Sequence, residues 1–333
     1  LGDLRFAYRS LRRTPGVVVV TVLSLGLGIA ASATVFSMAN ALLLGDPGPI
    51  GNPQSIIAVY TSEDGGRLYG ETSFPDSLDI RDGMETVQGL ASHRVRVVAV
   101  GDPDEADRAI VELVTGNYFQ VLDVDPVLGR GFLPEESVFG AAERVFVLSH
   151  RAWQERYGGS REVLGTTVQL DGTPYTIIGV APEGLMARFV RMDVDGWLPL
   201  GVPGGIYRAT ATRMADRSSR QFFMLGRLRS GRTLEEARAE LTILAERLHS
   251  ATPEDWEDRR GEPKVLTAES EARSRMPPDG RIALLGLFAL FLVGAFSILA
   301  LACSNVASLL LARTHKRAHE MAIRTSLGAG RGR

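Results

Sequence analysis

The sequence contains little lysine, cysteine or histidine, and each shortage excludes a class of chemistry. Its two lysines, Lys264 and Lys316, lie outside any G-x-x-x-x-G-K-[ST] pattern, the glycine-rich loop that cradles nucleotide phosphates. The chain therefore carries no Walker-type ATPase. The one cysteine, Cys303, can form no intramolecular disulfide and lies within an apolar run, away from a histidine that could activate it. Cysteine catalysis is therefore excluded.

Metal-ligating patterns are equally scarce. His315 and His319 are four residues apart and would share a helical face, but a metal site needs further ligands and no H-E-x-x-H pattern joins them. The acidic stretch at residues 102–107 and the pair Asp193 and Asp195 hold only fragments of a calcium-binding pattern, and we expect both to be solvated turns. The sequence thus predicts no catalytic residue, no metal and no cofactor, and indicates that the chain is not an enzyme.

Two long runs contain no charged residue: residues 17–44 and residues 282–312. Both exceed the roughly 20 residues that an α-helix needs to cross a hydrocarbon core of about 30 Å. We therefore expect two transmembrane helices. A cleaved signal peptide ending at the ANA of residues 39–41 is an alternative for the first run, but the apolar core of a signal peptide spans only about 7–15 residues. A buried helix of a soluble protein is the other alternative.

The charges divide with these runs. Residues 1–16 carry a charge of +3 and residues 313–333 carry +5. Because the whole chain has a net charge of −2, the 45–281 region must carry −10. Basic residues beside membrane spans stay in the cytoplasm, whereas a long segment is translocated whatever its charge. We expect a multi-pass protein of the inner (plasma) membrane with both termini cytoplasmic and the 45–281 region outside. The basic 1–16 segment has an apolar face and suits a helix in the cytoplasmic interface, or simply a charged flank.

Small residues recur every fourth position on both runs. Such faces let helices pack closely in lipid, although small residues are common in membrane helices generally. If the faces are real, the runs belong to a helix bundle. The residues are Ser24, Gly28 and Ser32 on the first run, and Ala300, Ser304, Ser308 and Ala312 on the second.

The 45–281 region is expected to fold as an α+β domain. Residues 166–180 predict a β-hairpin, because Asp171-Gly172 supplies the positive φ angles of a tight turn. Residues 233–250 predict a helix, because Thr233 and Glu236 form a capping box ahead of an apolar stripe of Leu234, Ala237, Leu241, Leu244 and Leu248. Four β-rich runs predict further strands, at residues 55–62, 93–100, 144–149 and 220–228.

Several stretches, in order along the chain, resemble one family of membrane proteins. They are DLRFAYRSLRRTPGVVVVTVLSLGLGIAASATVFSMANALLL (3–44), GNYFQVLDVDPVLGRGF (116–132), VLSHRAWQERYGG (147–159), VLGTTVQLDGTPYTIIGVAPEG (163–184), GRLRSGRTLEEARAEL (226–241) and RAHEMAIRTSLGAGRGR (317–333). The first resembles the start of a MacB-like ABC transporter permease of the long type described from acidobacteria, and the middle four resemble its periplasmic core. The last resembles the E-x-A-I-R-x-x-L-G-A segment of FtsX-like permease domains.

The resemblance implies a fold and a function. It implies two transmembrane helices flanking a large mixed α/β periplasmic core domain. It also implies at least two further spans, so the chain is expected to be an N-terminal fragment that ends in the cytoplasmic loop of residues 313–333. It implies a permease subunit that works in efflux or envelope remodelling by mechanotransmission. The implied partners are the membrane, an ABC ATPase on another polypeptide, a second permease copy or half and a periplasmic protein. No nucleic acid is expected.

The final segment is the expected contact with that ATPase. Glu320 and Arg324 are four residues apart, so they can pair on one helical face, and Leu327 before Gly328 would end the helix with an apolar side chain and a flexible cap. The alternative is a basic tail that only sets topology. Two other functions stay open from the sequence: a two-span sensor with an extracytoplasmic ligand-binding domain, and an FtsX-like regulator of cell-wall hydrolases.

Overall fold

The chain divides into two compact units, and each is described separately below. The flanking unit comprises Leu1–Gly45 and Ile282–Arg333, and the core unit comprises Asp46–Arg281. The computed structural model describes residues 16, 19, 22–23, 26–30, 32–34, 36–37, 48–62, 68–101, 106–137, 143–188, 192–202, 211–274 and 278–326.

One mixed sheet runs through the described part of the core unit. Its strands follow the order β10-β1-β9-β2-β3-β8-β5-β7-β4, with β6 paired to β2 and β7. The β3–β8 and β5–β7 pairs are parallel and the others antiparallel. The strands are β1 Ile56–Thr61, β2 Val87–Val100, β3 Asp107–Val114, β4 Leu128–Gly129, β5 Val145–Leu148, β6 Thr167–Leu170, β7 Thr173–Val180, β8 Gly196–Pro199, β9 Phe223–Leu228 and β10 Leu266–Ser270.

The long strand β2 belongs to two halves of the sheet. Its first part pairs with β9 in an open sheet, and its second part pairs with β3. Because β6 pairs with β2 at Val100 and Leu170, the pairs β2-β3-β8-β5-β7-β6 close into a ring, which leaves few free edges in this half. His93 lies at the crossing point, opposite Phe223 of β9 and Val114 of β3. We call the two parts the open half and the barrel half.

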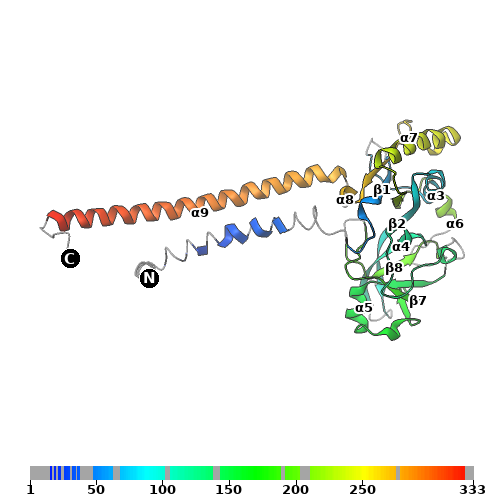
Figure 1. The fold of residues 1–333 in the computed structure, drawn as a ribbon, viewed down its shortest axis with the longest axis horizontal. Coiled ribbons are helices and arrows are strands. Elements are labelled where there is room, and N and C mark those ends of the chain that lie inside the picture. The colour runs from blue at the N-terminus through cyan, green and yellow to red at the C-terminus, as the bar shows by residue number, and fades with distance from the viewer. Residues whose placement is uncertain are drawn as a thin grey trace. The chain divides into compact units, whose positions relative to one another are not determined.

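Helix α7 shows how the sequence builds the open half. Thr233 accepts a hydrogen bond from the backbone N–H of Glu236, and the Glu236 side chain accepts from the backbone of Thr233, which completes the expected capping box. The predicted stripe is buried at Ala237, Leu241 and Leu244 in a cluster shared with strand residues. In Figure 1, α7 and α3 lie at one end of the core unit, while α5 and β7 lie at the other. The mixed α/β character of the core domain is thereby confirmed.

The described α-helices differ in length: α7 has 18 residues, α9 has 49, and the others have between 4 and 10. They are α3 Phe74–Gly83, α4 Tyr118–Leu122, α5 His150–Tyr157, α6 Ala211–Ala215, α7 Leu234–Ala251, α8 Glu271–Ser274 and α9 Pro278–Ser326, with the 3-10 helices η1 Pro53–Ser55, η2 Pro134–Ser137, η3 Arg161–Val163 and η4 Pro253–Asp255.

The expected hairpin at residues 166–180 is present, but the solvated turn expected at Asp193 and Asp195 is not fully solvated. β6 and β7 pair across Asp171 and Gly172, whose φ angles are 48° and 70°. Asp193 is exposed, whereas Asp195 is buried, so the prediction of a solvated turn is wrong for Asp195. Its Oδ2 accepts from the Ile110 N–H at 2.8 Å and its Oδ1 from Arg151 at 3.1 Å, which ties the start of β8 to β3 and α5. Residues 102–105 of the acidic stretch lie outside the described residues.

In the flanking unit, a glycine of the first apolar run lies close to α9. Gly28 is buried, and a Cβ placed on it would lie 3.6 Å from Cα of Leu299. Ala300, Ser304 and Ser308 are exposed, so the small-residue face expected on the second run is not buried within this unit. The side chains of Ser24 and Ala312 lie outside the described residues. A search of the described residues finds no helix with the length and hydropathy needed to span a membrane, and the two spans stay predictions.

Candidate functional site

The residues predicted to contact an ATPase fall at the end of α9. Glu320 and Arg324 lie within this helix, which ends at Ser326, as do His315 and His319. Nothing is described of the Glu320 and Arg324 side chains, and Leu327 and Gly328 lie outside the described residues. Their contact therefore stays a prediction. The described residues bring a different set of side chains together, in the core unit.

That set lies where the core unit begins and ends. β1 and β10 pair antiparallel with Ile57 opposite Ser270, so the residues before β1 and those after β10 meet at one end of the pair. The short helix α8 contacts β1, η1 and β10, and Figure 1 shows α8 beside β1. We call residues 48–55 the lead-in segment and residues 266–274 the exit segment. The flanking runs of the sequence connect to these two segments.

Arg227 of β9 holds the lead-in segment. It is 8% exposed, and its guanidinium donates from Nη2 to the Gly51 carbonyl at 2.7 Å, from Nη1 to Ser55 Oγ at 2.8 Å and from Nε to the Val121 carbonyl at 2.7 Å. Burial lowers the pKa of Arg227, which the nearby Asp123 opposes. An arginine nevertheless stays charged, and its fixed fork of donors suits several acceptors at once. One side chain thus ties the lead-in segment to the sheet and to α4.

Two arginines hold the exit segment. Arg238 of α7 donates from Nε to the Ala268 carbonyl at 2.8 Å and from Nη2 to Glu269 at 2.8 Å. Arg188 lies 3.3 Å from Glu271 of α8, between Nη1 and Oε1, and the two side chains are 2% and 4% exposed. The first arginine belongs to the open half. The second follows β7 and belongs to the barrel half.

The loop that carries Arg188 reaches both ends of the core unit. We call its residues 182–188 the junction loop. At the lead-in segment, a Cβ on Gly48 would lie 2.7 Å from the Gly184 carbonyl oxygen, and Gly48 has a φ of +81°. Leu185 of the loop shares a buried cluster with Ile50. At the exit segment, Arg188 pairs with Glu271. The barrel half therefore contacts both the beginning and the end of the core unit through one loop.

A fully buried carboxylate lies behind the junction loop. Glu112 Oε1 lies 2.8 Å from His93 Nδ1 and accepts from the backbone N–H of Arg188 at 3.3 Å. Its Oε2 accepts from the Tyr118 hydroxyl and the Trp197 indole, both at 2.8 Å. Burial alone would raise the pKa of Glu112, but its hydrogen bonds to His93, Tyr118 and Trp197 lower it overall. Because an ionised carboxylate only accepts hydrogen bonds, His93 Nδ1 is the donor.

This carboxylate joins the two halves of the sheet. His93 is the crossing residue of β2, Glu112 lies on β3, Tyr118 on α4 and Trp197 on β8. The Arg188 N–H extends the same set of hydrogen bonds to the junction loop. We call these side chains the Glu112 cluster. A displacement of the junction loop would therefore act on strands of both halves.

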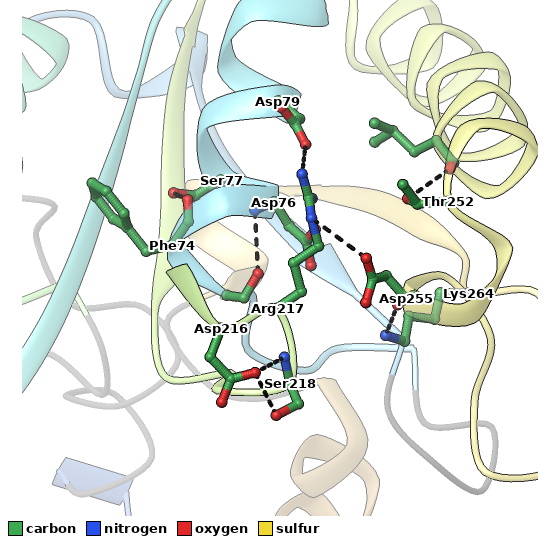
Figure 2. A network of polar contacts seen from close by, with 12 residues as sticks. Phe74, Asp76, Ser77, Asp79, Asp216, Arg217, Ser218, Thr252, Asp255 and Lys264 are labelled. Atoms are coloured by element: carbon green, nitrogen blue, oxygen red, sulfur yellow. Dashed lines mark hydrogen bonds and ion pairs between the residues drawn. The ribbon is translucent and has the colours of Figure 1, made fainter. Parts of the chain in front are cut away.

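A second polar network supports the open half (Figure 2). Arg217 reaches Asp79 at 2.7 Å and Asp76, both on α3, and lies 3.7 Å from Asp255 of η4. Burial raises the pKa of Asp76, while hydrogen bonds from Ser73 and Arg217 oppose that rise. The network fixes α3 against the connection between α7 and β10.

The polar side chains of these sites bond to other groups of the protein. Within the described residues, no group of three or more histidine, cysteine or acidic side chains could hold a metal ion. The carboxylates of the Glu112 cluster and of the Arg217 network accept from the protein's own donors. The arrangement holds the lead-in and exit segments to the rest of the core unit.

Sequence reasoning missed this junction. Arg188 and Glu271 are 83 residues apart, and no motif or spacing marks them as a pair. One local signal was available: Glu112 interrupts the apolar run of residues 109–114, and a carboxylate at a strand position of that kind requires buried partners. The identity of those partners depends on the strand order.

Comparison with known proteins shows which family the chain resembles. The family model described as the MacB-like periplasmic core domain matches residues 18–244. The periplasmic region of MacB from Actinobacillus actinomycetemcomitans is similar with 14% identity and a TM-score of 0.48, over 67% of this chain and 90% of that chain. The extracellular domain of the noncanonic ABC-type transporter YknZ from Gram-positive bacteria is similar with 15% identity and a TM-score of 0.44, over 64% and 99%. The search of curated proteins gave no match.

Proposed function

The chain belongs to the MacB-like periplasmic core domain family, and from this premise we propose that it is a permease subunit of a MacB-like ABC transporter. In this proposal residues 17–44 and 282–312 cross the inner membrane, the termini are cytoplasmic and the core unit is periplasmic. The charge distribution of +3, −10 and +5 supports this orientation. Large apolar side chains that are exposed in the flanking unit, such as Leu290 at 69% and Phe36 at 68%, are suited to lipid.

One observation carries the mechanical part of the proposal: the lead-in and exit segments meet at the β1–β10 pair, and the junction loop contacts both. If the two flanking helices move relative to each other, the two segments move with them because they are covalently connected. The junction loop then passes that movement to the barrel half, and the Glu112 cluster passes it across β2. In this proposal the chain is not an enzyme, and an ABC ATPase on another polypeptide supplies the energy.

The partners follow from the same proposal. The ATPase contacts the end of α9 through Glu320, Arg324, Leu327 and Gly328. A second permease copy or half completes the membrane part, and the outer surface of the core unit engages a periplasmic partner or substrate. The work done is efflux or envelope remodelling.

The test is co-purification of the ABC ATPase with the full-length protein. Arg324→Glu reverses a charge at the proposed contact, and a mismatched interfacial charge costs up to several kcal/mol, so the ATPase should be lost. Arg317→Glu is the matched control, because it makes the same change of net charge in the same flank and should retain the ATPase.

Three outcomes count against parts of the proposal. Equal ATPase binding by both variants would mean that the 313–333 segment only sets the membrane topology and does not contact the ATPase through Arg324. Loss of membrane insertion by Arg324→Glu would mean that the charge acts on topology. Absence of any ATPase from the wild-type preparation would remove the transporter role.

A further inference from the structure

We infer that Arg227 is the coupling residue of the lead-in segment: it joins this segment to α4, so that a displacement of the first apolar run reaches the Glu112 cluster. The inference rests on the proposed function, because that function supplies the displacement. Residues 17–44 lie just ahead of the lead-in segment in the sequence. A movement of that run therefore arrives first at residues 48–55.

The end of the lead-in segment is a tight turn that Arg227 holds on both sides. The Ser55 N–H and the Ser55 hydroxyl both donate to the Asn52 carbonyl, at 3.0 and 2.8 Å. Arg227 donates from Nη2 to the Gly51 carbonyl at 2.7 Å and from Nη1 to Ser55 Oγ at 2.8 Å. Because the donors of a guanidinium have fixed positions relative to one another, the turn cannot shift along β9 without loss of one of these bonds.

Gly51 also packs directly against the end of α4. Its N–H donates to the Leu122 carbonyl at 3.2 Å. A Cβ placed on Gly51 would lie 2.0 Å from Asp123 Oδ2 and 2.7 Å from Asp123 Cβ, so a larger residue requires a shift of Asp123. Asp123 has a φ of 52°, the left-handed conformation that is common just after a helix. The lead-in segment is therefore fitted to α4 by shape as well as by Arg227.

Helix α4 connects this contact to the interior of the domain. Arg227 Nε donates to the Val121 carbonyl at 2.7 Å. Tyr118 lies on the same helix and donates its hydroxyl to Glu112 Oε2 at 2.8 Å, which also accepts from Trp197 of β8. Tyr118 and Val121 are both buried in a helix of five residues. A displacement of the lead-in segment therefore passes through Arg227 to α4, and from α4 to the Glu112 cluster.

The strength of this connection comes from the charge and the shape of the arginine. A hydrogen bond to a charged group is worth about tenfold or more in an equilibrium constant, and the Arg227 guanidinium donates three to neutral acceptors. Methionine has a similar length but no donor. Lysine keeps the charge but presents it at one nitrogen, which cannot serve all three positions. These two substitutions separate the fork of donors from the volume and the charge of the side chain.

The first measurement is the distance between the lead-in segment and α4 in the full-length protein. Nitroxide labels are attached at Gln54→Cys and Gln120→Cys, two exposed positions, in a Cys303→Ser background. Electron spin resonance then gives the ratio of displaced to docked lead-in segment. Arg227→Met should raise this ratio by about a hundredfold, and Arg227→Lys should raise it less. The control Arg238→Met removes an arginine that holds the exit segment, and should leave the ratio unchanged.

A steric variant tests the same contact without a change at Arg227. Gly51→Ala should displace the lead-in segment, because its Cβ meets Asp123. The double variant Gly51→Ala/Asp123→Gly should restore the docked distance, since glycine removes the clash and readily adopts the left-handed φ of position 123. A reference label pair at Val97→Cys and Val127→Cys, both 55% exposed, should keep its distance in every variant. A change at the reference pair would show general damage and would count against a local coupling.

The second measurement follows α4 during ATP hydrolysis. The full-length protein is labelled at Gln120→Cys of α4 and Ile243→Cys of α7, and is purified with its ABC ATPase. ATP should change this distance in the wild type. In Arg227→Met the ATPase should still bind and hydrolyse ATP, but the change in distance should be lost. If Arg227→Met does not fold, Arg227→Lys carries both measurements, because it keeps the charge.

Three results would overturn the inference. The first is an unchanged distance between the lead-in segment and α4 in both Arg227 variants. The second is a failure of Asp123→Gly to restore docking in Gly51→Ala. The third is a response of α4 to ATP that is as large in the Arg227 variants as in the wild type, or absent from a wild type that holds its ATPase. Absence of the ATPase itself counts against the proposed function, and the first measurement, which needs no ATPase, then decides the inference.

Discussion

Substitution of Glu112 by Gln should unfold the core unit at markedly lower denaturant concentration. The carboxylate accepts from His93, Tyr118 and Trp197 at 2.8 Å and from the Arg188 N–H at 3.3 Å. A glutamine has one acceptor oxygen, and its amide nitrogen would face at least one of these donors. Breaking a buried charged interaction by removal of one partner costs about 3–5 kcal/mol, so we expect a loss of about that size in the free energy of unfolding.

The assay is equilibrium urea unfolding of residues 46–281, followed by tryptophan fluorescence. Glu155→Gln is the matched control: its carboxylate pairs with Arg151 on the surface with 60% exposure, and its loss should cost less than about 1 kcal/mol. A loss below about 1 kcal/mol for Glu112→Gln as well would refute the reasoning, because it would mean that the carboxylate is hydrated.

The same variant has a pH signature. The folded state lowers the pKa of Glu112, so its stabilising contribution is present above the unfolded pKa of about 4.3 and is lost as the pH falls through the lower, folded pKa. Wild type should therefore lose more stability than Glu112→Gln as the pH falls below about 4.3. The groups around Glu112, including His93 and Arg188, are the same in both proteins. Parallel pH profiles would contradict the assignment.

Three further predictions concern the core unit. Gly48→Ala should lower the free energy of unfolding more than Gly165→Ala, as measured by urea unfolding. Both glycines have a φ of +81°, but only a Cβ at Gly48 would lie 2.7 Å from another atom, the Gly184 carbonyl oxygen. Leu241→Ala, at 0% exposure in α7, should cost about 2–5 kcal/mol, while Ile243→Ala, at 58% exposure, should cost less than about 0.5 kcal/mol in the same assay. Residues 46–281 expressed alone should fold without a metal, so a chelator should leave the thermal unfolding midpoint unchanged, and a fall in the midpoint would contradict this.

Local chemistry explains which elements could be predicted. The α7 helix and the β6–β7 hairpin carry their signals within a few residues, in the Thr233–Glu236 capping box and the Asp171–Gly172 turn. β2 was expected over residues 93–100 but begins at Val87. Its first part contains Gly89, a poor strand former, and it is extended because it pairs with β9.

The candidate site could not be predicted because it depends on contacts between distant residues. The sequence around Asp195 is typical of a surface turn, but Asp195 is buried because β8 pairs with β3. Arg188 and Glu271 meet only because the junction loop and α8 reach the same end of the sheet. Their pairing depends on the topology of the fold and cannot be predicted from their spacing in the sequence.

Cysteine labelling tests the central claim of a periplasmic core unit between two spans most directly. In a Cys303→Ser background, single cysteines replace Val97 and Ile243, which are 55% and 58% exposed, and Arg12 and Arg317 in the two basic flanks. Right-side-out membrane vesicles are treated with a membrane-impermeant maleimide before and after permeabilisation. The account predicts labelling at positions 97 and 243 in sealed vesicles, and at positions 12 and 317 only after permeabilisation. Protection of positions 97 and 243 in sealed vesicles would contradict it.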